Sequence, residues 1–118
     1  MAQQLSNQRI AWFNGQFMPE NQVMIPFRDR SWKYGDGAFD MTRTFEGVPF
    51  RLKEHIDRLF YSAKAILLEI PMTHAQVMKA VVDTCRKNKL KEGYIRLVVT
   101  RGVGTLGLNP NRCEKPSV

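Results

Sequence analysis

The sequence has 118 residues, of which 43% are hydrophobic and 25% are charged, so it can form one globular domain with an apolar core. Its longest apolar runs, such as residues 65–68, are far too short to span a bilayer, and its polar N-terminus lacks the apolar stretch of a signal peptide. We therefore expect a soluble, cytoplasmic protein that does not enter a membrane.

The net charge of +7 raises the question of an anionic partner. The basic residues are dispersed, and their one dense cluster, Lys87, Lys89 and Lys91, lies at a predicted helix end, where cations suit the helix dipole. No nucleic-acid-binding motif accompanies it, so nucleic acid is not an expected partner. Neither the two cysteines nor the two histidines have metal-ligand spacing, and we expect no metal site.

The first predicted elements are strands. Residues 10–13 and 16–18 form a predicted hairpin, because Asn14-Gly15 supplies the two positive φ angles of a type I′ turn. Residues 23–25 are an apolar run before Pro26 and predict an edge strand, while residues 27–37 predict a charged loop.

The pattern from residue 38 to residue 45 alternates as in a strand, with Phe39, Met41, Arg43 and Phe45 on one face and Ala38, Asp40, Thr42 and Thr44 on the other. Glu46-Gly47 predicts a turn, and residues 48–52 predict the returning strand.

Two helices and a last strand follow. Residues 53–68 predict a helix with the apolar stripe Ile56, Leu59, Phe60, Ala63 and Leu67. A capping box at residues 73–76 opens a second helix with the stripe Met78, Val81, Val82 and Cys85. Residues 94–101 predict a strand with Tyr94, Arg96, Val98 and Thr100 on one face. This order predicts an α+β fold, with a mainly antiparallel sheet and two helices packed on it.

Few residues suggest chemistry by themselves. Gly102, Gly104 and Gly107 fit a dinucleotide-binding glycine pattern, but no helix follows them, so a mobile or partner-contacting loop is the better interpretation. Arg58 lies beside the apolar stripe of the first long helix, where an arginine is usually half of an ion pair, although its guanidinium could instead bind a phosphate. Arg43 and Arg96 lie within strands and must face either water or an anion.

Several motifs in this order resemble class IV aminotransferases, which depend on pyridoxal 5′-phosphate (PLP). The motifs are Tyr34-Gly35-Asp36-Gly37-Ala38-Phe39 with Arg43, then residues 50–59 with Ser62-Ala63, then Tyr94-Ile95-Arg96, then Thr100-Arg101-Gly102 with Gly104, Leu106-Gly107 and Pro110. Asn14-Gly15 and Asp29-Arg30 also fit the start of such chains. The resemblance covers nearly the whole sequence.

The resemblance implies a PLP enzyme of fold type IV with two domains, usually a homodimer or a higher homo-oligomer, of which residues 1–118 are the N-terminal small domain. Arg58 matches the arginine that binds the cofactor phosphate. The residues that match the substrate pocket and its rim are Tyr34, Phe39, Arg43, Tyr94, Arg96, Thr105 and Leu106. The Schiff-base lysine would follow Val118, so the resemblance implies no catalytic residue in this chain and no activity of the 118 residues alone.

The implied reaction transfers an amino group between an amino acid and a 2-oxo acid, with a branched-chain L-amino acid and 2-oxoglutarate as the preferred pair. Phe39-Asp40-Met41-Thr42 stands where many branched-chain enzymes have Phe-Glu-Gly, and residues 105–107 lack the Arg and His typical of D-amino-acid enzymes. A D-amino-acid or (R)-amine transaminase therefore stays open, whereas Leu106 disfavours an aminodeoxychorismate lyase, which usually has an arginine there. Outside the family, the alternatives are a non-catalytic dimerisation or binding module and, last, a nucleic-acid binder.

Overall fold

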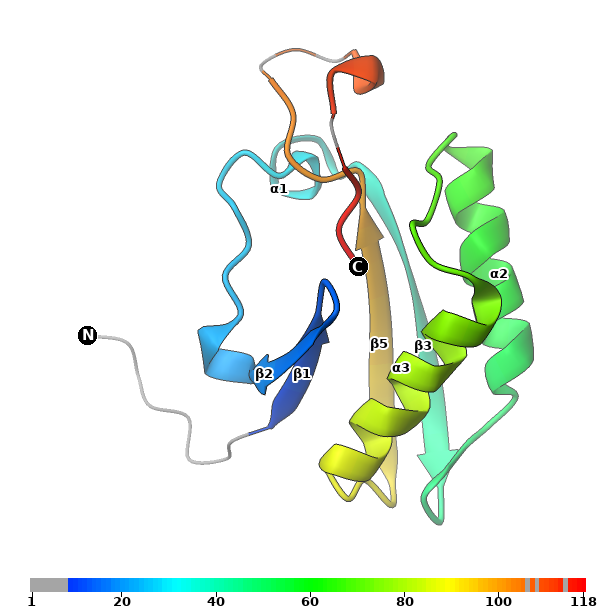
Figure 1. The fold of residues 1–118 in the computed structure, drawn as a ribbon. Helices are drawn as coiled ribbons and strands as arrows, with labels where there is room; N and C mark the ends of the chain where they lie inside the picture. The colour runs from blue at the N-terminus through cyan, green and yellow to red at the C-terminus, as the bar shows by residue number, and fades with distance from the viewer. Residues whose placement is uncertain (1–8, 106, 108, 114) are drawn as a thin grey trace.

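Two antiparallel sheets and two long helices make up the fold of the computed structural model, which describes residues 9–105, 107, 109–113 and 115–118 (Figure 1). The hairpin of β1 (Ile10–Phe13) and β2 (Gln16–Pro19) forms the first sheet. The second sheet has the order β4-β3-β5, made of β3 (Gly37–Phe45), β4 (Val48–Pro49) and β5 (Gly93–Thr100). All pairings within these sheets are antiparallel, which confirms the α+β prediction.

The two long helices cover one face of the larger sheet. Helix α2 (Leu52–Ala65) contacts β3, and α3 (His74–Lys87) contacts α2, β5 and β1 (Figure 1). Their buried faces meet the inward side chains of β5 and the link between the helices to form the core, which consists of Ile56, Leu59, Ala63, Leu68, Ile70, Val77, Val81, Cys85, Leu97 and Val99. Burial raises the pKa of the Cys85 thiol, as expected of a small core residue.

Local sequence rules explain several of these elements. Asn14 and Gly15 have φ angles of 47° and 92°, so the predicted tight hairpin turn is confirmed. Thr73 and Gln76 form the predicted capping box at the start of α3. In β3 every second side chain is buried from Asp40 to Thr44, as the alternation predicts.

Four predictions about element positions were wrong. Residues 23–25 form no strand: they pair with no described strand, and a 3₁₀ turn, Glu20–Gln22, comes directly before them. The predicted loop at 27–37 contains a short helix, α1 (Arg30–Tyr34). Strand β4 ends at Pro49 rather than residue 52, since Leu52 already begins α2.

The fourth error concerns helix ends and stripes. Helix α2 ends at Ala65, three residues before the prediction, so Leu67 adopts a positive φ and is exposed instead of buried. In α3, Val77 joins the buried stripe while Met78 and Val82 are only half-buried. Thr100 is buried at the end of β5, because Asp29 and Ser117 contact it there.

The last described residues form an extended segment across the end of the larger sheet. Ser117 pairs with Thr100, through N···O distances of 2.9 and 3.1 Å between their main chains. Val118 pairs with the turn of the hairpin, because its carbonyl accepts from Asn14 N at 3.0 Å. Residues 115–118 thereby connect β5 to the hairpin. No helix among the described residues is long and apolar enough to cross a membrane.

Candidate functional site

The face of the β3–β5 pair that points away from the helices carries exposed aromatic and basic side chains. The strand register places Phe39 opposite Val98, Met41 opposite Arg96 and Arg43 opposite Tyr94. These six side chains are exposed, because odd-numbered positions of β3 and even-numbered positions of β5 up to Val98 point outward. We call this set the open face.

The two arginines of the open face lie over aromatic rings of the same strand pair. The guanidinium carbon of Arg96 is 4.1 Å from the ring centroid of Phe39. That of Arg43 is 4.8 Å from the centroid of Phe45 and 5.5 Å from that of Tyr94. Cation–π contacts of this kind orient the guanidinium groups without neutralising their charge. The open face can therefore offer positive charge to an anion and apolar surface to an attached hydrocarbon group.

Arg58 lies on α2 and pairs with Asp40 of β3. Its Nε donates to Asp40 Oδ2 at 2.6 Å and its Nη2 donates to Asp40 Oδ1 at 2.9 Å. The Arg58 side chain is 65% exposed, whereas that of Asp40 is 4% exposed. The hydrogen bonds from Arg58 hold the pKa of the Asp40 carboxyl below its usual value, with a smaller contribution from His55. Asp40 is therefore ionised at neutral pH.

Only one edge of the Arg58 guanidinium is used by this pair. A guanidinium has five N–H donors, and a carboxylate on Nε and Nη2 leaves the edge formed by Nη1 and the second Nη2 hydrogen. Within the described part of the chain, no hydrogen-bond partner is found for Arg58 Nη1, while Nη2 also lies 3.4 Å from His55 Nδ1. We call Nη1 with this second hydrogen the outer edge of Arg58. It has the geometry that binds a carboxylate or a phosphate through two parallel hydrogen bonds.

The structure does not bring all predicted site residues together on one surface. Asp40 points toward α2, while its neighbours Phe39 and Met41 point to the open face, because successive side chains of a strand alternate. Arg58 therefore approaches β3 from the helix side, and the predicted substrate residues Arg43, Tyr94 and Arg96 lie on the other side of the strand pair.

Tyr34 lies at the end of α1, beside the glycine-rich loop. Gly107 N donates to the Tyr34 hydroxyl at 3.4 Å, and Gly107 O accepts from Arg30 Nη1 at 2.8 Å. Thr105 is exposed in this loop, and the predicted site residue Leu106 lies outside the described residues. These contacts hold part of the loop against α1, at the end of the sheet where β3 begins.

Sequence reasoning missed the acidic partners of the arginines. It placed Asp40 on the strand face opposite Phe39 and Met41 without pairing it to Arg58, and it gave Asp36 no role. Asp36 Oδ2 accepts from Arg30 Nε and from Arg101 Nε, each at 2.8 Å. Burial by itself raises the pKa of Asp36. The hydrogen bonds from Arg101 and Arg30 together lower it by more than burial raises it, so the pKa lies below the usual value.

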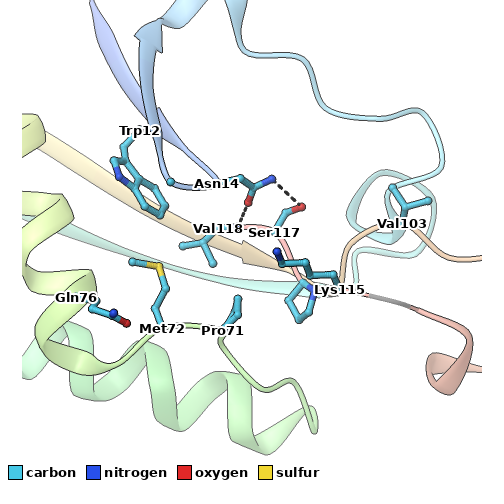
Figure 2. Close-up of a pocket in the computed structure, with 11 residues that line it drawn as sticks. Trp12, Asn14, Pro71, Met72, Gln76, Val103, Lys115, Ser117 and Val118 are labelled. Carbon is cyan, nitrogen blue, oxygen red and sulfur yellow. Dashed lines mark hydrogen bonds between the residues drawn. The ribbon is translucent and has the colours of Figure 1, made fainter.

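A separate hollow of about 550 Å³ lies between the hairpin, the link before α3 and residues 115–118. Figure 2 shows Trp12 and Met72 beside this space, with Asn14 bonded to Ser117 and Val118 at its edge. Of the predicted site residues that the structure describes, none lines it. Among the described residues, no group of three or more His, Cys, Asp or Glu side chains is arranged to hold a metal ion.

The chain is similar to proteins of known family in sequence and in fold. A Methanocaldococcus jannaschii protein provisionally named branched-chain-amino-acid aminotransferase is 48% identical over 91% of this chain and 37% of its own length. The D-alanine aminotransferase of Bacillus licheniformis is 32% identical over 76% of this chain and 32% of its own length. The chain thus spans about a third of the length of these relatives.

Solved structures of aminotransferases have a similar fold. The branched-chain aminotransferase of Thermoproteus uzoniensis, crystallised with norvaline, superimposes with a TM-score of 0.85 at 31% identity, over 94% of this chain and 39% of the other. The branched-chain amino acid aminotransferase of Escherichia coli superimposes with a TM-score of 0.88 at 28% identity, over 94% of this chain and 39% of the other. The model of the family "Amino-transferase class IV" matches residues 37–118. By sequence and by fold, this chain belongs to the class IV aminotransferases.

Proposed function

We propose that this chain is the N-terminal small domain of a PLP-dependent transaminase that acts on a branched-chain L-amino acid and 2-oxoglutarate. The similar proteins named above are aminotransferases, and the more similar of the two sequence relatives carries a branched-chain name. We place the Schiff-base lysine and the second domain beyond Val118, so that the 118 residues alone are inactive.

The outer edge of Arg58, whose Nη1 has no hydrogen-bond partner among the described residues, is the observation that carries the proposal. PLP has a phosphate group, and a guanidinium edge binds a phosphate through two charge-assisted hydrogen bonds. Two further solved structures similar to this chain, both of a branched-chain amino acid aminotransferase, contain N-(5′-phosphopyridoxyl)-L-glutamate and pyridoxamine 5′-phosphate. When bound, PLP supplies an electron sink for negative charge that develops on the amino acid substrate. The role of Arg58 is to hold the phosphate and so fix the position of the cofactor.

The open face is proposed to recognise the substrate. Arg96 and Arg43 supply positive charge for a substrate carboxylate, and their ring contacts limit how far each guanidinium can move. Phe39 and Tyr94 supply apolar surface for a branched side chain. Tyr34, with Thr105 of the loop, would line the end of the pocket nearest α1.

A homodimer or a higher homo-oligomer is part of the proposal. Large apolar side chains outside the open face, among them Phe27 and Trp32, are also exposed, and contact with a second copy would cover them. The glycine-rich loop is proposed to reach this interface.

The test is a transaminase assay on the full-length protein that contains this chain. With PLP present, we expect amino transfer from L-leucine, L-isoleucine or L-valine to 2-oxoglutarate, with kcat/KM at least tenfold above that for D-alanine. A preference for D-alanine or for an (R)-amine would replace the branched-chain assignment by the alternative within the family. Absence of any amino transfer, in protein that carries PLP, would contradict the transaminase proposal.

A further inference from the structure

Asp40 is a buried acid on a strand face that is otherwise apolar or neutral. Its neighbours on this face, Thr42 and Thr44, satisfy their hydroxyls by donating to the main-chain oxygens of Phe50 at 2.9 Å and Gly93 at 3.4 Å. Asp40 has a relative exposure of 5%, and burying a carboxylate is costly unless charged or polar groups surround it. An uncharged residue at position 40, like Thr42 and Thr44, would avoid this cost. Stability alone therefore does not explain an acid at this position.

Both oxygens of Asp40 are used. Oδ2 accepts from Arg58 Nε, and Oδ1 accepts from Arg58 Nη2 and from His55 Nδ1, which lies 2.7 Å away. Because an ionised carboxylate has no hydrogen to donate, the hydrogen of the short contact with His55 is on Nδ1. His55 and Arg58 are one helical turn apart on α2, so one helix face supplies every side-chain donor that the described residues offer to Asp40.

This arrangement fixes the orientation of an otherwise mobile side chain. An arginine that is 65% exposed has considerable rotamer freedom, which it must lose before it can bind an anion through two hydrogen bonds. The two hydrogen bonds that Arg58 donates to Asp40 remove that freedom in advance and hold the Nε edge inward. The outer edge is left facing away from the carboxylate, ready for a ligand.

We propose that Asp40 is a positioning residue for phosphate binding, which holds Arg58 by its inner edge and, with His55 bracing the carboxylate, presents the outer edge to the cofactor phosphate. This inference rests on the proposed function, because it takes PLP as the ligand of Arg58. It differs from a purely structural role in one respect: loss of Asp40 should weaken binding of the phosphate more than binding of the rest of the cofactor.

The test compares PLP with pyridoxal, which lacks the phosphate, as ligands of the full-length protein stripped of cofactor. Binding is followed by absorbance and fluorescence titration in the wild type and in Asp40→Asn, Arg58→Ala and Asp57→Asn. Asn has nearly the shape of Asp but no charge. Asp57 is the matched control, since it is an exposed α2 carboxylate that pairs with Lys53 at 2.7 Å instead of with Arg58.

We expect Asp40→Asn to weaken PLP binding at least tenfold and to change pyridoxal binding less than twofold. Arg58→Ala should act in the same direction and more strongly, and Asp57→Asn should leave both affinities unchanged. Equal weakening of PLP and pyridoxal in Asp40→Asn, or no weakening, would overturn the positioning role. If Arg58→Ala still lost PLP selectively, the proposed function would stand; a wild type that bound neither compound would instead refute the proposed function itself.

A second variant keeps the proposal testable where Asp40→Asn does not fold. His55→Ala removes the brace from Asp40 without leaving a buried charge unpaired, because Arg58 still pairs with the carboxylate. We expect a loss of PLP affinity of a few fold, with pyridoxal affinity unchanged. Unaltered affinity for PLP in this variant would contradict the bracing role of His55 and, with it, the proposed arrangement.

Discussion

Asp36 is the acidic partner of two nearly buried arginines. The side chains of Arg30 and Arg101 are 6% and 12% exposed, and both donate to the same oxygen of Asp36. Arg101 also donates to the carbonyls of Ile66 and Leu67, at 2.6 and 3.0 Å. The carboxylate therefore connects α1 and the end of β5 to the link after α2.

Replacing Asp36 by Asn should destabilise the protein by about 3 kcal/mol, near the lower end of the range for breaking a buried ion pair. We expect the loss to appear in urea unfolding of the full-length protein at pH 7, followed by tryptophan fluorescence. Asp57→Asn, which breaks an exposed pair, should cost less than about 1 kcal/mol. Equal effects of the two substitutions would show that the Asp36 pairs contribute no more than a surface pair.

The lowered pKa of Asp36 also predicts how the destabilisation by Asp36→Asn depends on pH. Since the folded-state pKa of Asp36 is lowered, its contribution to stability is complete above the ordinary aspartate pKa of about 3.9 and is lost as the pH falls through the folded-state value. The difference between wild type and Asp36→Asn should therefore shrink at acid pH. A difference that grew on acidification would contradict the lowered pKa.

At the residue scale, sequence reasoning predicted which side chains share a face better than which side chains pair. Alternation alone correctly placed Phe39, Met41 and Arg43 on one side of β3 and Asp40 on the other. It could not pair Asp40 with Arg58, because the two are 18 positions apart and the residues between them include a turn and the start of a helix whose geometry only the fold defines. One signal was available: Asp40 shares its face with small and neutral side chains, and an acid on such a face requires a basic partner if the face is buried.

At the scale of elements, long periodic segments were predicted and short ones were not. Helix α1 has five residues, too few for a hydrophobic period, yet its ends carry recognisable signals. Asp29 caps the helix by accepting from Ser31 N at 2.8 Å, and Gly35 ends it in the left-handed conformation. The false strand at residues 23–25 shows the converse limit: three apolar residues form a strand only where a neighbouring strand offers hydrogen bonds.

The capping box of α3 offers a test at this scale. Thr73 Oγ1 accepts from Gln76 N at 3.2 Å, and Gln76 Oε1 accepts from Thr73 N at 2.9 Å. Thr73→Ala should lower the free energy of unfolding by about 1 kcal/mol, because two main-chain N–H groups at the helix start lose the paired arrangement. Thr73→Ser, which keeps the hydroxyl, is the control and should lose only a few tenths of that. The measurement is urea unfolding; identical losses in both variants would exclude the cap as the cause.

At the scale of the whole molecule, the sequence predicted the layers but not what connects them. It indicated one mainly antiparallel sheet, whereas the hairpin forms its own sheet and is joined to β5 through residues 115–118. That connection depends on a pairing between Thr100 and Ser117 and on bonds from Asn14, more than a hundred positions away in sequence from Ser117 and Val118. No local pattern encodes contacts of this range.

Gly102 is where this connection can be broken by a single methyl group. Its φ is +86°, and a Cβ built there would lie 1.9 Å from the carbonyl oxygen of Lys115, so residues 115–118 would have to move. In Gly102→Ala we expect faster hydrogen–deuterium exchange at the amides of Thr100, Ser117 and Val118, which all donate in this connection. Gly107→Ala separates the two causes, since Gly107 also has a positive φ, of +112°, but has open space around its Cβ position. If Gly107→Ala accelerated exchange at these three amides as much as Gly102→Ala, backbone strain in the loop, and not the collision with Lys115, would be what releases the segment.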